Sequence, residues 1–272
     1  CWTTSSICIV IDLITGIKSV HHAICIVRKM RFCAHLAFCF VIFAPCGSLP
    51  KIFKRCKIED NECLKSSVEN AILNLGNGLE ELNIEPIDPL SIPPQEYQPI
   101  PGPVSLYQKY SNGIYQHLSK LKVMQFRIDL DKCGIYLETF YPTIFFSANY
   151  SIKGQLAHLE VDAEGIGNGT STNSTMLVNV TCATYLQNDK EHIKVNDVHV
   201  ELVKAKFEAH LGEIFKGNDS LNEVFDKTIN ENIEAFMDTT IPGEIAALGA
   251  LFKETMNKVF SKYSVKEIFE DN

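Results

Sequence analysis

The C-terminal part of the chain, Ser220–Tyr263, carries apolar residues at helical spacing. Leucine, isoleucine, valine, phenylalanine and methionine recur there every three or four positions, and small residues widen the stripe beyond Ile245. The sequence Ser220-Leu-Asn-Glu223 has the capping-box pattern of a helix start. Pro242 is expected to break or kink the helix, because it lacks a backbone N–H and clashes with the preceding turn. A helix this apolar has to be covered on most of its sides.

The middle of the chain alternates apolar and polar residues with a period of two, which predicts β-strands. Further strands are expected at 193–195 and 198–211, whereas the Gly/Ser/Thr-rich stretch 165–175 is expected to be a loop. Antiparallel strands with one apolar face need a cover, and the C-terminal helix can supply it. We therefore predict an α+β fold in which a highly curved antiparallel sheet wraps the long C-terminal helix. The predicted inward-facing sets are Met124, Phe126, Ile128 and Leu130; Ile135, Leu137, Thr139 and Tyr141; Ile144, Phe146, Ala148, Tyr150 and Ile152; and Met176, Val178, Val180 and Cys182.

Two segments with different patterns precede these strands. One face of a predicted helix carries Leu64, Val68, Ile72, Leu75 and Leu79, and the end of this helix is loosened by Gly76 and Gly78. The following stretch, 83–103, is rich in proline and is expected to be extended chain that crosses a surface. It is predicted to form neither a helix nor a central strand.

The front of the chain looks like targeting sequence rather than part of the fold. We expect residues 1–29 to be upstream sequence outside the translated protein and 30–47 to be a secretory signal peptide. Arg31 gives the basic start, 32–43 the apolar core and 44–48 the small-residue exit. A transmembrane anchor is the alternative, but the apolar run is shorter than the ~20 residues of a membrane span. The mature, secreted domain is then 48–272.

Charge argues against nucleic acid as a partner. The chain carries 25 Lys/Arg and 33 Asp/Glu, of which four basic residues and one acidic residue fall within 1–47. The remainder has a net charge of about −11, and such a surface repels nucleic acid and anionic lipid head groups.

Cysteines and sequons fit an exported protein. An even set of four cysteines follows residue 47, which suggests disulfides. We expect a Cys56–Cys63 bridge, with two free thiols as the alternative. Cys133 lies in a predicted hairpin turn and Cys182 on an inward strand face, so whether they pair depends on strand order. Five sequons would place their asparagines on the outside: Asn149, Asn168, Asn173, Asn179 and Asn218.

The sequence contains only partial matches to known catalytic and metal-binding motifs. The sequence that starts at Asp129 begins like a calcium loop, but its twelfth position is Phe140 instead of a bidentate glutamate. Gly165-Ile-Gly167-Asn-Gly169 has the wrong spacing for a dinucleotide loop. Neither a Gly-x-Ser-x-Gly elbow nor a His-Glu-x-x-His motif is present. We predict no catalytic residue, no metal and no cofactor.

Several short motifs occur in an order that resembles a known family. The motifs are the Cys56…Cys63 pair, Leu82-Asn-Ile84-Glu-Pro86-Ile-Asp88-Pro89-Leu90, Gly102-Pro103, Phe126-Arg-Ile-Asp-Leu-Asp131, Tyr141-Pro142 and Phe215-Lys-Gly-Asn218. With these motifs the chain resembles, from about Leu49 to Phe269, the insect Takeout and haemolymph juvenile-hormone-binding proteins. This resemblance implies an apolar tunnel between the helix and the sheet, and a role as carrier of apolar ligands.

We predict that the mature protein is a monomeric carrier of one small apolar ligand, such as a fatty acid, a terpenoid or a juvenile-hormone-like molecule. Bulky inward residues next to small ones leave room for it. Two alternatives stay open: an extracellular glycoprotein with a filled core that acts through protein–protein contacts, and an extracellular lipid esterase. No stable membrane insertion is expected. The predicted ligand contacts are Phe126, Ile128, Phe146, Ala148, Tyr150, Val180, Phe236, Met237, Leu248 and Phe252.

Overall fold

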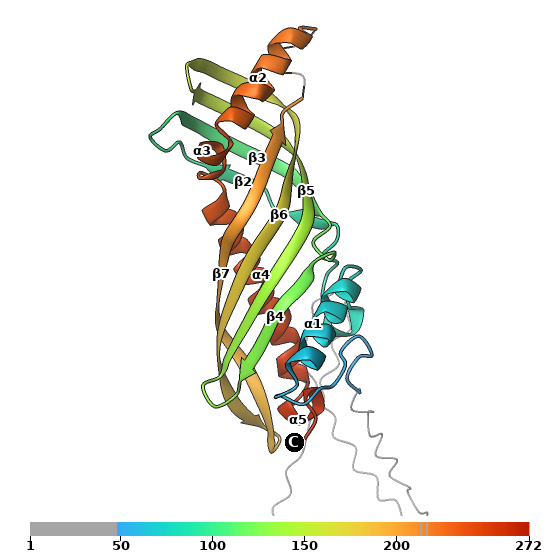
Figure 1. Ribbon diagram of the computed structural model, residues 1–272. Coiled ribbons are helices and arrows are strands. Elements are labelled where there is room, and N and C mark those ends of the chain that lie inside the picture. Colours follow the sequence, from blue (N-terminus) through green and yellow to red (C-terminus); the bar gives the residue numbers. More distant parts are fainter. Residues whose placement is uncertain (1–47, 213, 216, 272) are drawn as a thin grey trace, which may run out of the picture. The chain divides into compact units, whose positions relative to one another are not determined.

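The computed structural model describes residues 48–212, 214–215 and 217–271, and the expected signal peptide lies outside them. One antiparallel sheet of seven strands dominates the fold (Figure 1). The strand order is β1-β3-β5-β6-β7, while β2 also pairs with β3 and β4 with β5. The strands are β1 (Leu90–Ile92), β2 (Gln95–Tyr97), β3 (Val104–Gln116), β4 (Lys122–Asp129), β5 (Gly134–Leu156), β6 (Leu159–Gln187) and β7 (Lys190–His210).

The long strand β5 has two partners on one edge. β4 pairs with its first part, up to Phe140, and β3 pairs with its second part, from Phe145. Between these parts, at Pro142, the buried side changes from odd to even positions. On β6, Asn173 lies opposite Pro142 with φ of 51°, and the buried positions change parity there as well. The sequence pattern predicted both inward faces of β5 correctly, as two separate strands.

The strand predictions differ from the structure at four points. The stretch 165–175 is the middle of β6 rather than a loop, and β3 was not predicted at all. The two strands expected at 193–195 and 198–211 are one strand, β7. Met124 is exposed, because a β-bulge between Val123 and Gln125 turns it outward. The proline-rich stretch forms β1 and β2, which pair only with β3 and lie at the sheet's edge, as proline requires.

The predicted C-terminal helix is divided. It comprises α2 (Asp219–Glu231), α3 (Ile233–Met237) and α4 (Ile241–Lys262), followed by α5 (Val265–Ile268). Pro242 lies in the first turn of α4, where its missing N–H costs nothing, so the break falls just before it. The expected capping box at Ser220 is wrong. Asn218 is the N-cap of α2, and its side-chain oxygen accepts a 3.1 Å hydrogen bond from the N–H of Leu221.

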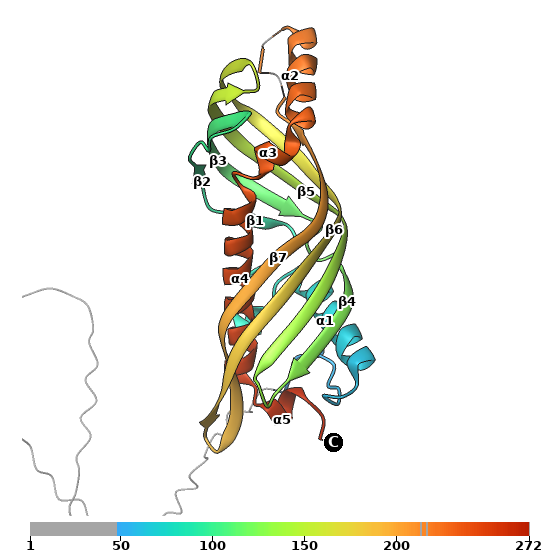
Figure 2. The same ribbon diagram turned by 60° about the vertical axis from the view of Figure 1, so that its left-hand side comes forward.

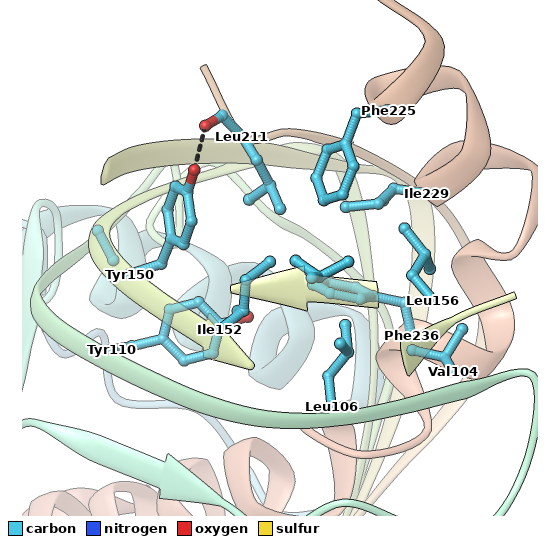
Figure 3. Close-up of a cluster of buried hydrophobic side chains, with 12 residues drawn as sticks. Val104, Leu106, Tyr110, Tyr150, Ile152, Leu156, Leu211, Phe225, Ile229 and Phe236 are labelled. Carbon is cyan, nitrogen blue, oxygen red and sulfur yellow. Dashed lines mark hydrogen bonds between the residues drawn. The ribbon is translucent and has the colours of Figure 1, made fainter. Parts of the chain in front are cut away.

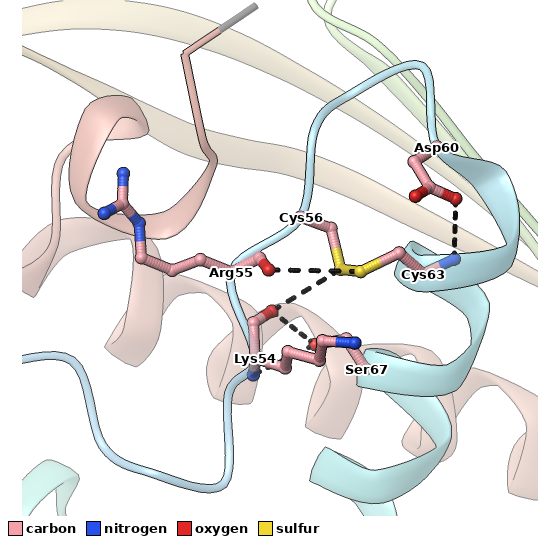
Figure 4. The surroundings of a disulfide bond; sticks show 6 residues. All are labelled: Lys54, Arg55, Cys56, Asp60, Cys63 and Ser67. Carbon is pink, nitrogen blue, oxygen red and sulfur yellow. Dashed lines mark hydrogen bonds between the residues drawn. A yellow bond between two sulfur atoms is a disulfide. The ribbon is translucent and has the colours of Figure 1, made fainter.

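The N-terminal helix is held by a disulfide. α1 (Asn61–Leu75) begins after its N-cap Asp60 and is followed by the short 3-10 helix η1 (Glu80–Leu82). Cys56 and Cys63 are bonded, as predicted (Figure 4). The hydroxyl of Ser67 donates a 2.7 Å hydrogen bond to the carbonyl oxygen of Lys54, which fixes the incoming chain on α1.

A second disulfide settles the open cysteine question. Cys133 and Cys182 are bonded, with their Cα atoms 5.0 Å apart. Strand order explains why they meet. Cys133 directly precedes β5, whose first residue, Gly134, pairs with Thr181 on β6.

Two asparagines attach the C-terminal helices to the outer edge of β7. Asn257 on α4 accepts from the backbone N–H of Val195 at 2.9 Å and donates to its carbonyl oxygen at 3.1 Å. Asn230 on α2 does the same to Ala209, at 2.9 Å and 2.7 Å. Figures 1 and 2 both show α4 running alongside β7.

The core has two main parts. One lies where α2 and α3 pack on β3, β5 and β6, around Phe225, Ile229 and Ile152, each at most 1% exposed (Figure 3). The other lies where α4 packs on β5, β6 and β7, around Val178 and Val195. Among the described residues, no helix is long and apolar enough to cross a bilayer.

Candidate ligand-binding cavity

A cavity of about 330 Å³ lies between the sheet and the helices α3 and α4. Its volume is at the lower end of the ~300–1,000 Å³ typical of small-molecule sites. Aromatic, aliphatic and glycine residues make up most of its wall. The lining residues from the edge strands and β3 are Leu90, Ser91, Ile92, Pro93, Gln95, Tyr97, Tyr110, Tyr115 and Leu118. Those from the other elements include Ile144, Phe146, Ala148, Gly167, Gly169, Met176, Leu202, Phe207, Phe236, Met237, Glu244, Ile245, Ala247, Leu248 and Leu251.

Several small residues lie along the cavity wall. Gly167 and Gly169 stand two positions apart on β6 and line it, and Ala148 lines it from β5. Ala209 and Ala247 line it from β7 and α4. Since consecutive inward positions on a strand alternate with outward ones, the glycines remove two neighbouring side chains from one face of β6.

Five of the ten predicted ligand contacts line the cavity. They are Phe146, Ala148, Phe236, Met237 and Leu248. As ligand contacts they stay predictions.

The other five predicted residues do not line this cavity. Phe126 and Ile128 pack in the cluster around Cys133, while Val180 and Phe252 belong to the core beneath α4. Tyr150 is buried and its hydroxyl donates to the carbonyl oxygen of Leu211 at 2.6 Å. The apolar inner face of the sheet is longer than the cavity, so facing inward does not identify a cavity residue.

A polar group that the pattern analysis missed lies in the wall. Glu244, in the first turn of α4, lines the cavity together with Tyr97, Tyr110 and Tyr115. The residue is half-buried and lines the cavity. The hydroxyls of Tyr115 and Thr240 lie close enough to stabilise the carboxylate, and the Thr240 hydroxyl also donates to the carbonyl oxygen of Met237 at 3.3 Å. One feature of the sequence could have pointed to this residue, because Glu244 is the only acid among Ile241–Leu251.

Burial dominates the electrostatics of this wall. Burial raises the pKa of the Glu244 carboxyl, although the two hydroxyls oppose the shift by stabilising the carboxylate. Burial and the nearby Glu244 charge raise the pKa of Tyr97 to about 12. The pKa values of Tyr110 and Tyr115 are raised for the same two reasons. All three tyrosines are therefore neutral hydrogen-bonding groups at physiological pH.

Aromatic rings form one side of the cavity in a continuous row. The ring centroids of Tyr97 and Tyr110 lie 6.1 Å apart, those of Tyr110 and Phe146 6.0 Å, and those of Phe146 and Tyr115 4.9 Å. Edge-to-face and tilted pairs at these distances are attractive and hold the rings in place. The row links the edge strand β2 to β3 and β5.

All five sequon asparagines are exposed: Asn149, Asn168, Asn173, Asn179 and Asn218. Asn168 and Asn173 lie on β6 rather than on the expected loop, and Asn168 also lines the cavity. Their glycosylation stays a prediction. No group of three or more His, Cys, Asp or Glu within the described part of the chain is arranged to hold a metal ion.

The fold matches that of a solved structure. The crystal structure of Epiphyas postvittana Takeout 1 is similar, with a TM-score of 0.72 and 18% sequence identity. The match covers 80% of this chain and 99% of that one. The crystal structure of lipopolysaccharide binding protein gives a TM-score of 0.34 at 9% identity, over 68% of this chain and 39% of that one.

No curated protein sequence matches the chain. The model of the haemolymph juvenile hormone binding protein (JHBP) family, in contrast, matches residues 33–270. That match spans most of the chain and both core regions described above. The resemblance inferred from the motifs is thus confirmed, and the chain belongs to the haemolymph juvenile hormone binding protein family.

Proposed function

We propose that this protein is a secreted carrier that holds one small apolar molecule in the cavity between the sheet and α4. The observation that carries the proposal is the cavity wall itself, in which aliphatic and aromatic side chains far outnumber polar ones. An apolar cavity is a poor place for water, because a buried water needs two to four polar partners. An apolar ligand gains roughly 0.8 kcal/mol for each methylene group that it buries.

Two alternative functions are weaker. A glycoprotein with a filled core would leave no space of about 330 Å³ lined by Phe146, Leu248 and Ala247. An esterase needs a nucleophile and a base in contact with the ligand. Of the described lining residues, the serines and threonines that could act as nucleophiles are Ser91, Thr170, Ser171 and Thr240, and none of the lining residues is a histidine that could act as the base. Hydrolysis of a chromogenic ester measures this alternative directly.

A pair of variants on α4 tests the carrier function. Ala247 and Ala246 are adjacent and both exposed, but only Ala247 lines the cavity. Ala247→Trp is expected to abolish binding of the neutral fluorescent probe N-phenyl-1-naphthylamine, because the indole fills the space. Ala246→Trp, the matched control, should bind the probe like the wild type. Absence of probe binding by the wild type, or equal binding by all three proteins, would contradict the proposal.

Export is the other part of the proposal. The four bonded cysteines and the exposed positions of the sequon asparagines suit an oxidising, extracellular compartment. We expect cleavage between Pro45 and Leu49. N-terminal sequencing of protein secreted from insect cells would test it, and a mature N-terminus upstream of Met30 would overturn the assignment of 30–47 as the signal peptide.

A further inference from the structure

The carboxyl of Glu244 is an acidic group in an otherwise apolar part of the cavity wall. Its neighbours on the same helix, Ile245, Leu248 and Leu251, line the cavity with aliphatic side chains. Tyr97 on β2 and Tyr110 on β3 lie near its charge, and Phe146 on β5 lines the same cavity. Burying an acid there has a cost, which the same helix position with an apolar residue would avoid.

Glu244 keeps hydrogen-bonding capacity beyond its protein partners. A carboxylate offers about four lone-pair sites. The nearby hydroxyls of Tyr115 and Thr240 can take up at most two of them. Because the residue lines the cavity, the remaining sites are available to a ligand that fills it.

No cation on the wall compensates this acid. The lining residues include no lysine, arginine or histidine. The other acid of the wall, Glu208 on β7, is exposed and therefore hydrated. Any further negative charge that enters the cavity would be buried without a counter-ion, which is strongly unfavourable.

We propose that Glu244 is the polar anchor of the cavity, and that it selects ligands whose polar end is an uncharged hydroxyl over ligands that end in a carboxylate. This inference rests on the proposed carrier function and narrows its ligand class. A hydroxyl hydrogen can be donated to the open lone pairs of Glu244 whether or not the carboxyl is ionised. A carboxylate of the same chain length meets either a like charge or a buried site without a cation.

Substitution of Glu244 with glutamine tests the charge and hydrogen bonding of this side chain while its shape is kept. Glu244→Gln keeps the shape and an oxygen that accepts from Tyr115, but it removes the charge and adds N–H donors that suit a carboxylate. The matched control is Glu208→Gln, which removes an acid from the hydrated part of the wall. Circular dichroism and thermal unfolding would verify that both variants fold.

The measurement is displacement of N-phenyl-1-naphthylamine by dodecan-1-ol and by dodecanoate at neutral pH. The informative quantity is the ratio of the two dissociation constants, acid over alcohol, since ionised acids enter apolar sites less readily in any protein. We expect Glu244→Gln to lower this ratio about tenfold, which is the effect of one hydrogen bond to a charged group. Glu208→Gln should leave it unchanged within about twofold.

The outcomes distinguish the two proposals. If the wild type binds the probe and both ligands displace it, but Glu244→Gln leaves the ratio unchanged, the anchor is refuted while the carrier function stands. Tighter binding of dodecylamine than of dodecan-1-ol would also refute it, because the site would then select a cation. If the wild type binds neither probe nor ligands, the carrier function fails and the anchor with it.

Discussion

The hydroxyl of Tyr150 donates a 2.6 Å hydrogen bond to the carbonyl oxygen of Leu211 (Figure 3). This bond joins the second half of β5 to the residue that follows β7, beside the entry to α2. The backbone N–H of Leu211 in turn donates to Asp226 on α2 at 3.1 Å. The role of Tyr150 is thus to stabilise the fold at one end of the sheet.

Replacing Tyr150 with phenylalanine is therefore expected to destabilise the protein by about 1–3 kcal/mol, because a buried carbonyl oxygen loses its partner. Urea unfolding measures this loss of stability. Tyr107→Phe is the control: Tyr107 donates to Glu96 in an exposed bond, and its loss should cost less than about 0.5 kcal/mol. Equal effects of the two variants would contradict this role of Tyr150.

Gly167 is expected to tolerate no side chain. A Cβ atom there would lie 2.8 Å from Leu211 Cδ2 and 3.1 Å from Tyr150 Cδ1. Gly167→Ala should therefore overpack the site and cost about 1–3 kcal/mol. At Gly134 the nearest atom to a Cβ is 3.8 Å away, so Gly134→Ala should unfold like the wild type. A Gly167→Ala protein with unchanged thermal unfolding would show that β6 can shift.

Glu244 should make stability depend on pH. Burial raises its pKa above the ordinary 4.5, so the native state holds the proton where the unfolded chain has released it. The free energy of unfolding that this residue contributes therefore falls as pH rises above the unfolded value. The tyrosines that face it, Tyr97, Tyr110 and Tyr115, have raised pKa values and stay neutral in this range.

Glu244→Gln removes this dependence. The variant should gain stability relative to the wild type as pH rises from about 4 to about 8, whereas near pH 4 the two should differ least. Urea unfolding across this range gives the difference. If the free energy of unfolding changed with pH in the same way for both proteins, the Glu244 carboxyl would titrate in the folded protein as it does in the unfolded chain, which would contradict the prediction.

The two disulfides should contribute unequally. Cys133 and Cys182 are 49 residues apart in sequence, and Cys56 and Cys63 only 7. Loop-closure entropy predicts stabilisation of about 4 kcal/mol for the longer loop and about 2.5 kcal/mol for the shorter one. Double Cys→Ser variants, compared by urea unfolding, test the order. A larger loss for the Cys56/Cys63 variant would contradict it.

Alternation along the chain was enough to predict how β5 faces the core. Ile144, Ala148 and Ile152 are all buried, as the pattern requires. It failed on β6, because glycines at 165, 167 and 169 suggest a loop. Their spacing of two instead marks one face of a strand, and the Tyr150 ring packs beside Gly165 and Gly167.

β3 escaped prediction for a related reason. Its inward position Gln108 is polar yet fully buried, and the strand has a register shift between Ser111 and Ile114. Both features hide the period of two. The anchor residue Glu244 was missed because a single acid in an apolar helix carries no periodic signal, and its tyrosine partners come from strands that the pattern did not reveal.

The contacts of Asn257 and Asn230 have a consequence for how this chain behaves among its own copies. An edge strand with open N–H and C=O groups is a template on which another chain can add a strand, and such addition leads to aggregates. At Val195 and Ala209 an amide side chain already takes up both backbone groups, as a neighbouring strand would. The last strand of the sheet is thereby closed to intermolecular β-pairing at two points, which suits a protein that has to stay dispersed in the proposed role of carrier.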